Sequence, residues 1–178
     1  MNKSSVLFFL LLLLTSCSVR QSTRQPVFRS YQIVPDTHAK ILEGILQRSD
    51  IDHDTAFKWF QQNYALGQAD QAAVSVFQKD SARFQMVVFF GTWCEDSQNL
   101  LPVFYRLVDK SGYPEKNITL IGVDRKKQAP GNLSQAFEIT NVPTFIVMQN
   151  GREIGRVVEY GKYGRIDKEL GEIVSAIK

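Results

Sequence analysis

Apolar residues occur along the second half of the chain in runs that predict strands alternating with helices. Near-continuous apolar runs, typical of strands buried on both faces, predict strands over 84–90, 118–124 and 143–149. Asn150-Gly151 separates the last run from another apolar stretch at 152–160, and Asn-Gly in this setting predicts a hairpin. Helical spacing predicts helices over 54–64, 69–79, 95–110, 133–137 and 165–177.

The order of these elements predicts an α/β fold with a central mixed sheet flanked by helices. We expect parallel strand pairs linked by helical crossovers, followed by one antiparallel hairpin. Residues 18–35 are polar without sustained periodicity and predict a tether. Residues 39–47 are apolar enough for a short edge strand or a helical turn, and both alternatives stay open. The predicted organisation is a signal at 1–17, a tether and extension at 18–51, and one domain at 52–178.

The amino terminus has the pattern of an export signal. Lys3 precedes the apolar run Val6–Leu14, which is shorter than the roughly 20 residues that a membrane-spanning helix needs. The following "LTSC" resembles the bacterial lipobox, which implies that Cys17 becomes a lipidated first residue. Several acyl chains on one residue suffice for stable membrane anchoring. An ordinary signal peptide with an incidental Cys17 is the alternative, although no small-residue cleavage site is evident.

Composition and cysteine count exclude several classes of function. The net charge is +3, and the basic residues are scattered except for the cluster Arg125–Lys127, so we predict no nucleic-acid partner. The chain has two cysteines, and lipidation of Cys17 leaves Cys94 as a single free thiol in an oxidising compartment. One free cysteine cannot assemble a metal site with the solvated His38 and His53, and we predict neither a metal nor a cofactor.

The free thiol lies in "GTWCEDSQ", directly after the apolar run 84–90 and at the start of a predicted helix. This stretch, Pro102 inside the helix, and "NVPTF" followed by the hairpin "NGREIGR" together resemble the thioredoxin superfamily over about residues 52–178. The form "WCEDS" is similar to that of secreted bacterial thioredoxin-like proteins with "WCxDS". The resemblance implies a thioredoxin-like fold in which Pro143 is cis and lies against Cys94, with Trp93 beside a binding groove.

Two positions depart from the thioredoxin pattern in a consistent way. Ser97 stands where the resemblance places a resolving cysteine, and Val88 stands where it places a buried aspartate that assists this cysteine. Without a second thiol, a buried carboxylate at position 88 would bring only its desolvation cost. The predicted site therefore consists of Trp93, Cys94, Ser97 and Pro143, with Ser97 able to hydrogen-bond the sulfur but unable to displace it.

The reaction available to Cys94 is thiol–disulfide exchange without a resolving cysteine. A helix N-terminus stabilises a thiolate, while the carboxylates of Glu95 and Asp96 oppose it, so we expect a moderately activated thiol. Attack on a substrate disulfide would give a mixed disulfide that an external thiol must release. An alternative is oxidation of the Cys94 thiol to a sulfenic acid, which a second thiol then reduces. The predicted partners are protein or small-molecule thiols and disulfides, with an external reductant.

A second function stays open at this stage. The fold could be redox-inactive, with Cys94 a relic beside a groove that binds a partner, in a binding or structural lipoprotein. In either case we expect an exported lipoprotein held by its lipid. Ser18 follows the lipidated residue where an aspartate would signal retention in the inner membrane, which favours the outer membrane, facing the periplasm.

Overall fold

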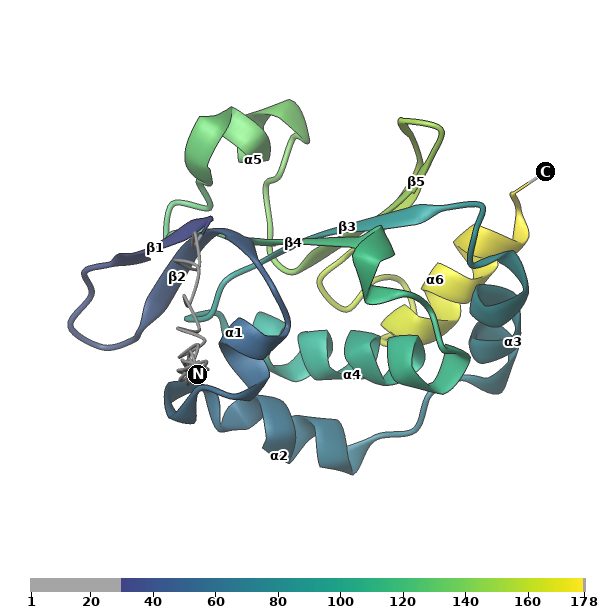
Figure 1. The fold of residues 1–178 in the computed structure, drawn as a ribbon, viewed down its shortest axis with the longest axis horizontal. Helices are drawn as coiled ribbons and strands as arrows, with labels where there is room; N and C mark the ends of the chain where they lie inside the picture. Colours follow the sequence, from purple (N-terminus) through teal and green to yellow (C-terminus); the bar gives the residue numbers. More distant parts are fainter. Residues whose placement is uncertain (1–29, 178) are drawn as a thin grey trace, which may run out of the picture.

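The computed structural model describes residues 30–177, which form one six-stranded mixed sheet with helices on both faces (Figure 1). The strands are β1 (Tyr31–Val34), β2 (Ile41–Leu46), β3 (Gln85–Phe90), β4 (Ile118–Gly122), β5 (Thr144–Gln149) and β6 (Arg152–Val158). The helices are α1 (Ser49–Asp52), α2 (Trp59–Leu66), α3 (Gln71–Asp80), α4 (Glu95–Ser111), α5 (Leu133–Ala136) and α6 (Ile166–Ser175). Short 3-10 turns cover Thr55–Phe57, Glu115–Asn117 and Pro130–Asn132. The predicted α/β class with a central mixed sheet is confirmed.

The prediction of several parallel pairs is wrong, because among residues 30–177 only β3 and β4 run parallel. The strand order is β1-β2-β4-β3-β5-β6, and β5 lies antiparallel to β3. The connection between β4 and β5 contains α5, which has four residues and is therefore about 6 Å long. Residues 123–143 leave β4 and return to the sheet at the same edge, because Phe90 pairs with Gly122 and Phe89 with Thr144, so β5 starts at that edge and runs antiparallel. The predicted hairpin is confirmed: Asn150 and Gly151, both with positive φ, join β5 to β6.

The amino-terminal part of the described chain belongs to the sheet. The predicted tether is wrong for Tyr31–Val34, since these residues form β1 and pair with β2. Residues 39–47 adopt the strand alternative, as β2 adds antiparallel to β4. The predicted signal, with Cys17, and most of the tether lie outside the described residues. Between residues 30 and 177, no helix has the length and apolar character that crossing a membrane requires.

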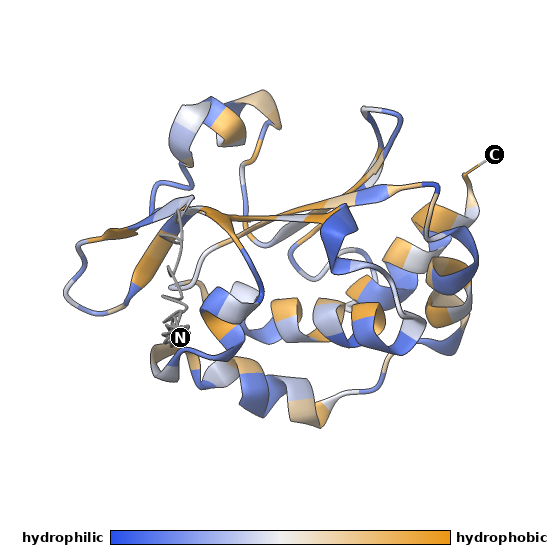
Figure 2. Ribbon diagram, viewed as in Figure 1, coloured by the Kyte–Doolittle hydropathy of each residue, from blue (hydrophilic) through white to orange (hydrophobic). Residues whose placement is uncertain are grey.

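Apolar residues pack on both faces of the sheet, and the central strand β3 contributes side chains to both. Met86, Val88 and Phe90 are fully buried against the helical layer of α1–α4 and α6. Phe89 points to the other face, where it packs with Ile121 and Ile146 beneath α5. Strand side chains alternate between faces, so a strand covered on both sides is apolar at nearly every position. Figure 2 shows the resulting band of hydrophobic residues along the sheet and the inner helix faces.

The helix predicted over 54–64 is divided in two. Asp54 accepts a hydrogen bond from Ala56 N and caps a 3-10 turn, and α2 begins only at Trp59. From α2, Asn63 Nδ2 donates to Gln98 O at 3.0 Å. That carbonyl lies four residues before Pro102, which has no N–H to offer it. The amide of Asn63 therefore satisfies a helix carbonyl that the proline leaves unpaired inside α4.

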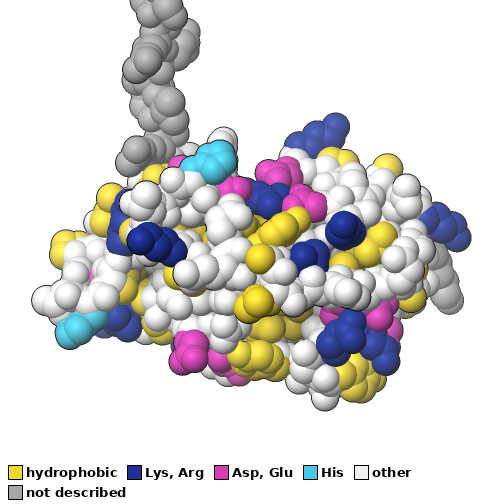
Figure 3. Space-filling view, turned by 90° about the horizontal axis from the view of Figure 1, so that it is seen from below, with side chains coloured by type: hydrophobic (Ala, Val, Ile, Leu, Met, Phe, Trp, Pro, Cys, Tyr) yellow, Lys and Arg dark blue, Asp and Glu magenta, His cyan; other side chains and the backbone are white. Residues whose placement is uncertain are grey.

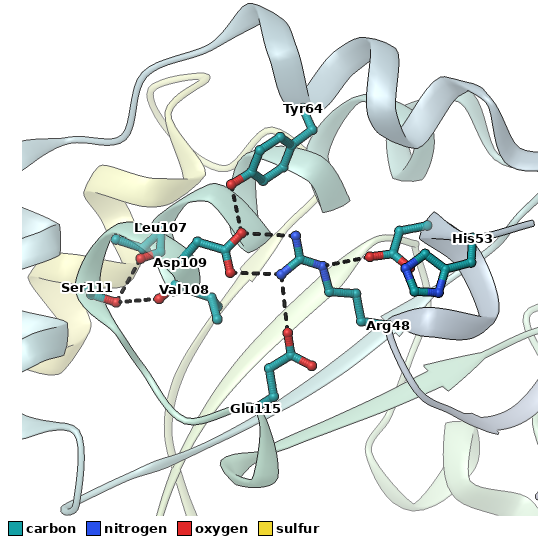
Figure 4. A network of polar contacts seen from close by, with 9 residues as sticks. Arg48, His53, Tyr64, Leu107, Val108, Asp109, Ser111 and Glu115 are labelled. Atoms are coloured by element: carbon teal, nitrogen blue, oxygen red, sulfur yellow. Dashed lines mark hydrogen bonds and ion pairs between the residues drawn. The ribbon is translucent and has the colours of Figure 1, made fainter.

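A polar network holds the chain after β2 against the carboxyl-terminal end of α4 (Figure 4). Arg48 donates from both terminal nitrogens to Asp109, at 2.7 and 2.9 Å, and also contacts Glu115 and Asp52. Tyr64 donates to the same Asp109 carboxylate at 2.7 Å. A two-pronged arginine–carboxylate pair fixes orientation as well as distance. The network thus joins the amino-terminal extension, α2 and α4 at the end opposite Cys94.

Candidate functional site

Cys94 lies where the central strand gives way to the longest helix. β3 ends at Phe90, and Cys94 is the N-cap residue of α4, with Cys94 N donating to Gly91 O at 3.0 Å. Its side chain is half-buried and unpaired with any cysteine in the part of the chain that the structure describes. The first N–H groups of a helix have no partner within the helix, and the macrodipole favours negative charge there. The thiol therefore lies at a helix end that favours an anion.

The segment before β5 meets the thiol, as the resemblance implies. The Val142–Pro143 peptide bond is cis, so the predicted isomer is confirmed. Cys94 Sγ donates to Val142 O at 3.3 Å. This contact joins residues far apart in the sequence, because β5 enters the sheet beside the carboxyl end of β3. Cys94 and the cis-proline segment thus form one site.

Ser97 lies near Cys94 at the start of α4, and its hydrogen-bond partner is the loop backbone. It is fully buried, and its Oγ accepts a hydrogen bond from Gly91 N at 3.1 Å. Its Oγ accepts from the backbone and still has its O–H to donate, so hydrogen bonding from Ser97 to the Cys94 sulfur stays a prediction. Residues three apart on a helix share a face, which keeps Ser97 close to the thiol. Its hydroxyl satisfies a buried N–H and holds the loop that carries Cys94.

Trp93 is anchored rather than freely exposed. Its indole Nε1 donates to Val123 O at 3.0 Å, and the side chain is half-buried against the core under α5. The indole covers Gly91, where an added Cβ would lie only 2.7 Å from the ring. Glycine at position 91 is required by this close approach. The Arg125 guanidinium lies 5.4 Å from the indole centroid, within cation–π range.

The amino-terminal extension reaches this site through Asp36, which sequence analysis missed. Arg125 Nε donates to Asp36 Oδ2 at 2.7 Å, so the guanidinium links the loop after β1 to Trp93. The Arg125 hydrogen bond, supported by the backbone N–H groups of His38 and Ala39, holds the pKa of Asp36 well below its usual range. Only the tertiary structure brings Asp36 and Arg125 together, and no local pattern signals the pair.

We predict that Arg125→Gln will raise the pKa of Asp36 toward about 3.9, the value of a free aspartate. Carboxyl ¹³C NMR across an acid titration measures it. A depressed folded-state pKa stabilises the protein above the unfolded-state pKa, and this stabilisation is lost as pH falls through the folded-state pKa. The stability difference between wild type and Arg125→Gln should therefore shrink on acidification. Arg152→Gln, on the hairpin, is the control; an Asp36 that titrates at its usual pKa in wild type contradicts the pairing.

Thr92 joins the same extension to the Cys94 loop. It is buried, and its Oγ1 donates to Lys40 O at 2.8 Å and accepts from Leu42 N at 3.3 Å. Gln98 Nε2 in turn donates to Thr92 O at 2.9 Å. The hydroxyl thus satisfies two backbone groups at the start of β2. Sequence analysis missed Thr92, because its partners at the start of β2 lie some fifty positions earlier in the chain.

We predict that Thr92→Val will lower the free energy of unfolding by about 1–3 kcal/mol, because the isosteric valine leaves buried backbone groups of β2 unpaired. Chemical denaturation measures the loss, and hydrogen exchange should show faster exchange at Leu42 N. Thr119→Val, on the exposed face of β4, serves as the matched control. Equal stability of the two variants would show that the Thr92 bonds contribute nothing.

The chain that forms this site is similar to known thioredoxins and thioredoxin-like proteins. The thioredoxin family model matches residues 69–172, more than half of the chain. A thioredoxin-like protein of Acanthamoeba polyphaga mimivirus is 30% identical over 93 residues, which are 52% of this chain and 64% of that protein. Thioredoxin-1 of Saccharomyces cerevisiae is 28% identical over 86 residues, 47% of this chain and 78% of that protein.

A solved structure of the reduced thioredoxin pre-protein of Schistosoma mansoni is 28% identical, covers 62% of this chain and 95% of that one, and has a TM-score of 0.40. The alignment with the viral relative spans less than two thirds of that protein. The match over residues 69–172, together with the Cys94 and cis-Pro143 geometry, leads to one conclusion: the chain belongs to the thioredoxin family.

Proposed function

We propose that this protein performs thiol–disulfide exchange through Cys94 alone. The observation that carries the proposal is the half-buried Cys94 thiol at the start of α4, 3.3 Å from the carbonyl of Val142 and next to cis-Pro143. The sequence offers one other cysteine, Cys17, which is proposed to carry lipid. The site thus has one nucleophile and no internal partner to complete a disulfide cycle.

The reaction has two exchange steps. The Cys94 thiolate attacks one sulfur of a substrate disulfide, forming a mixed disulfide and releasing the other sulfur as a thiolate, which takes up a proton. An external thiolate then attacks the mixed disulfide and expels Cys94 as the thiolate, leaving the substrate bonded to that external thiol. A second external thiol completes the reduction. Two electrons pass from the external thiols to the substrate, and Cys94 is regenerated unchanged.

The surroundings of Cys94 support this one-thiol cycle. Ser97 cannot attack a disulfide, and its Oγ accepts a hydrogen bond from Gly91 N that holds the loop before Cys94. Val88 is fully buried in the core against the helices, and a carboxylate at that position would have no second thiol to serve. Glu95 is exposed, so water and salt screen its charge from the sulfur.

A redox-inactive binding function is the second candidate, because the absence of a resolving cysteine at position 97 also fits a fold that has lost its catalysis. In that case Cys94 is a bystander, and the surface near Trp93 and Pro143 holds a partner. The alkylation rate of Cys94 as a function of pH separates the two candidates. An exchange protein should react faster at neutral pH than an unperturbed thiol, which titrates near about 8.5. A rate equal to that of a free cysteine supports the binding function.

We further propose that the protein is exported and anchored by lipid on Cys17, at the outer membrane and facing the periplasm. The support is the "LTSC" stretch after the apolar run Val6–Leu14, with Ser18 following it. Mass spectrometry of the mature amino terminus, together with membrane fractionation, tests this proposal. A diacylglyceryl-modified Cys17 as first residue is expected. An unmodified terminus at another residue ends the lipoprotein proposal without affecting the exchange chemistry.

A further inference from the structure

A buried arginine on the helical side of the molecule has no partner for two of its nitrogens. Arg106, on α4, is 8% exposed. Its Nε and Nη2 atoms are inaccessible to water and make no hydrogen bond with any residue from 30 to 177. These two atoms form one edge of the guanidinium plane, the edge that takes two oxygens of a single carboxylate or phosphate. A buried cation without a paired anion lowers the stability of the folded state, so the missing partner of Arg106 needs a physical explanation.

The neighbours of Arg106 do not supply that anion. Its guanidinium lies over the ring of Tyr64, 4.5 Å from the centroid. Asp109 is the acidic group close enough for its pKa to be affected by Arg106, but its carboxylate oxygens are occupied by Arg48 and Tyr64. Gly67 lies beside Nε, where an added Cβ would be 3.5 Å away. The unpaired edge therefore faces the loop between α2 and α3.

A surface pocket opens at this loop. Its lining contains two charged residues, Arg106 and Lys110, together with Gly67, Gln68, Ala69, Gln71 and Val74. No acidic side chain lines the pocket within the described chain. Figure 3 views the molecule from the helical side and shows basic side chains among apolar ones near the middle of this face. The pocket thus combines two cations with side-chain amides and lacks a counter-charge.

We propose that this pocket binds a small oxyanion, a phosphate or carboxylate group. The Nε and Nη2 edge of Arg106 would donate to two of its oxygens, and Lys110 would add a point charge from the exposed rim. Nε and Nη2 are inaccessible to water in this structure, so binding must move the neighbouring loop that contains Gly67. Arg106 is about 18 Å from Cys94 along α4, at about 1.5 Å per residue, which makes this a second site apart from the thiol.

The test uses the full chain in a nonionic detergent, titrated with inorganic phosphate and separately with acetate at constant ionic strength. Amide NMR should show saturable changes confined to residues 67–71 and the neighbourhood of Arg106. Calorimetry should show at least tenfold weaker binding for Arg106→Lys, which keeps the charge but loses the two-pronged edge. Lys110→Met should weaken binding to a smaller extent, and Lys79→Met, an exposed lysine on α3, should leave it unchanged.

Saturable binding of either anion with this order of variants supports the site, and the two titrations tell phosphate from carboxylate. Several results overturn it: no saturation with either anion, an equal loss for Lys79→Met and Lys110→Met, or unchanged affinity in a folded Arg106→Lys. If Arg106→Lys does not fold, Lys110→Met decides, because Lys110 is exposed and its replacement leaves the core intact. The outcome is independent of Cys94, so the exchange chemistry is judged separately.

Discussion

Cys94→Ser is expected to abolish capture of disulfide substrates completely. Wild-type protein mixed with a small oxidised thiol should gain the mass of one mixed disulfide, and the serine variant should gain none, because a hydroxyl does not attack a disulfide under these conditions. Mass spectrometry of the intact protein reads the result directly. Serine is nearly isosteric with cysteine, and the half-buried position accommodates it, so the fold should be retained.

The variant also separates the two candidate functions in cells. If exchange is the function, Cys94→Ser should remove both the adduct and any phenotype that depends on the protein. If partner binding is the function, the same variant should leave partner association intact, while substitution of Trp93 should weaken it. Adduct formation by Cys94→Ser would place the reactive thiol elsewhere and contradict the site.

Ser97→Cys is expected to shorten the lifetime of the mixed disulfide by roughly tenfold or more. The new thiol would lie three residues from Cys94 on the same helix face, where intramolecular attack gains from proximity. The adduct should then decay to an internal disulfide without external thiol. Val88 limits the gain, because it provides no carboxylate to accept the proton of the buried thiol.

Ser97→Ala is the matched control for this experiment. It removes the same hydroxyl and leaves Gly91 N without its acceptor, but it adds no nucleophile. We expect the adduct of Ser97→Ala to last as long as that of wild type, with a modest loss of stability. An unchanged lifetime in Ser97→Cys would mean that the sulfur bound to Cys94 is out of reach of position 97, which contradicts the geometry described for the start of α4.

Much of the fold could be predicted because local pattern and tertiary burial agree. The apolar runs that become β3, β4 and β5 are buried on both faces, and Asn150-Gly151 forms its turn without help from distant residues. β1 could not be predicted, because Gln32 and the exposed Ile33 give no alternating pattern at the edge of the sheet. The direction of β5 depends on where residues 123–143 bring the chain back to the sheet. The pattern of apolar residues does not indicate that position.

The residues of the candidate site likewise include some that the sequence predicts and some that only the folded structure reveals. Cys94, Trp93 and Pro143 could be found because they carry a motif in which residue type and spacing are themselves the signal. Asp36, Thr92 and Asn63 could not, because each acts through a hydrogen bond to a residue far away in the sequence. The hydrogen bond from Gly91 N to Ser97 Oγ could not be predicted either, because it depends on how the loop before α4 folds back onto the helix.

The lifetime of the mixed disulfide in wild-type protein tests the central claim most directly. Full-length protein is loaded with a small oxidised thiol, freed of excess reagent and followed by intact mass, before and after addition of an external thiol. We predict one adduct per chain on Cys94 that persists without external thiol and disappears promptly when it is added. Failure to form an adduct, or its loss without any external thiol, would contradict exchange through a single cysteine.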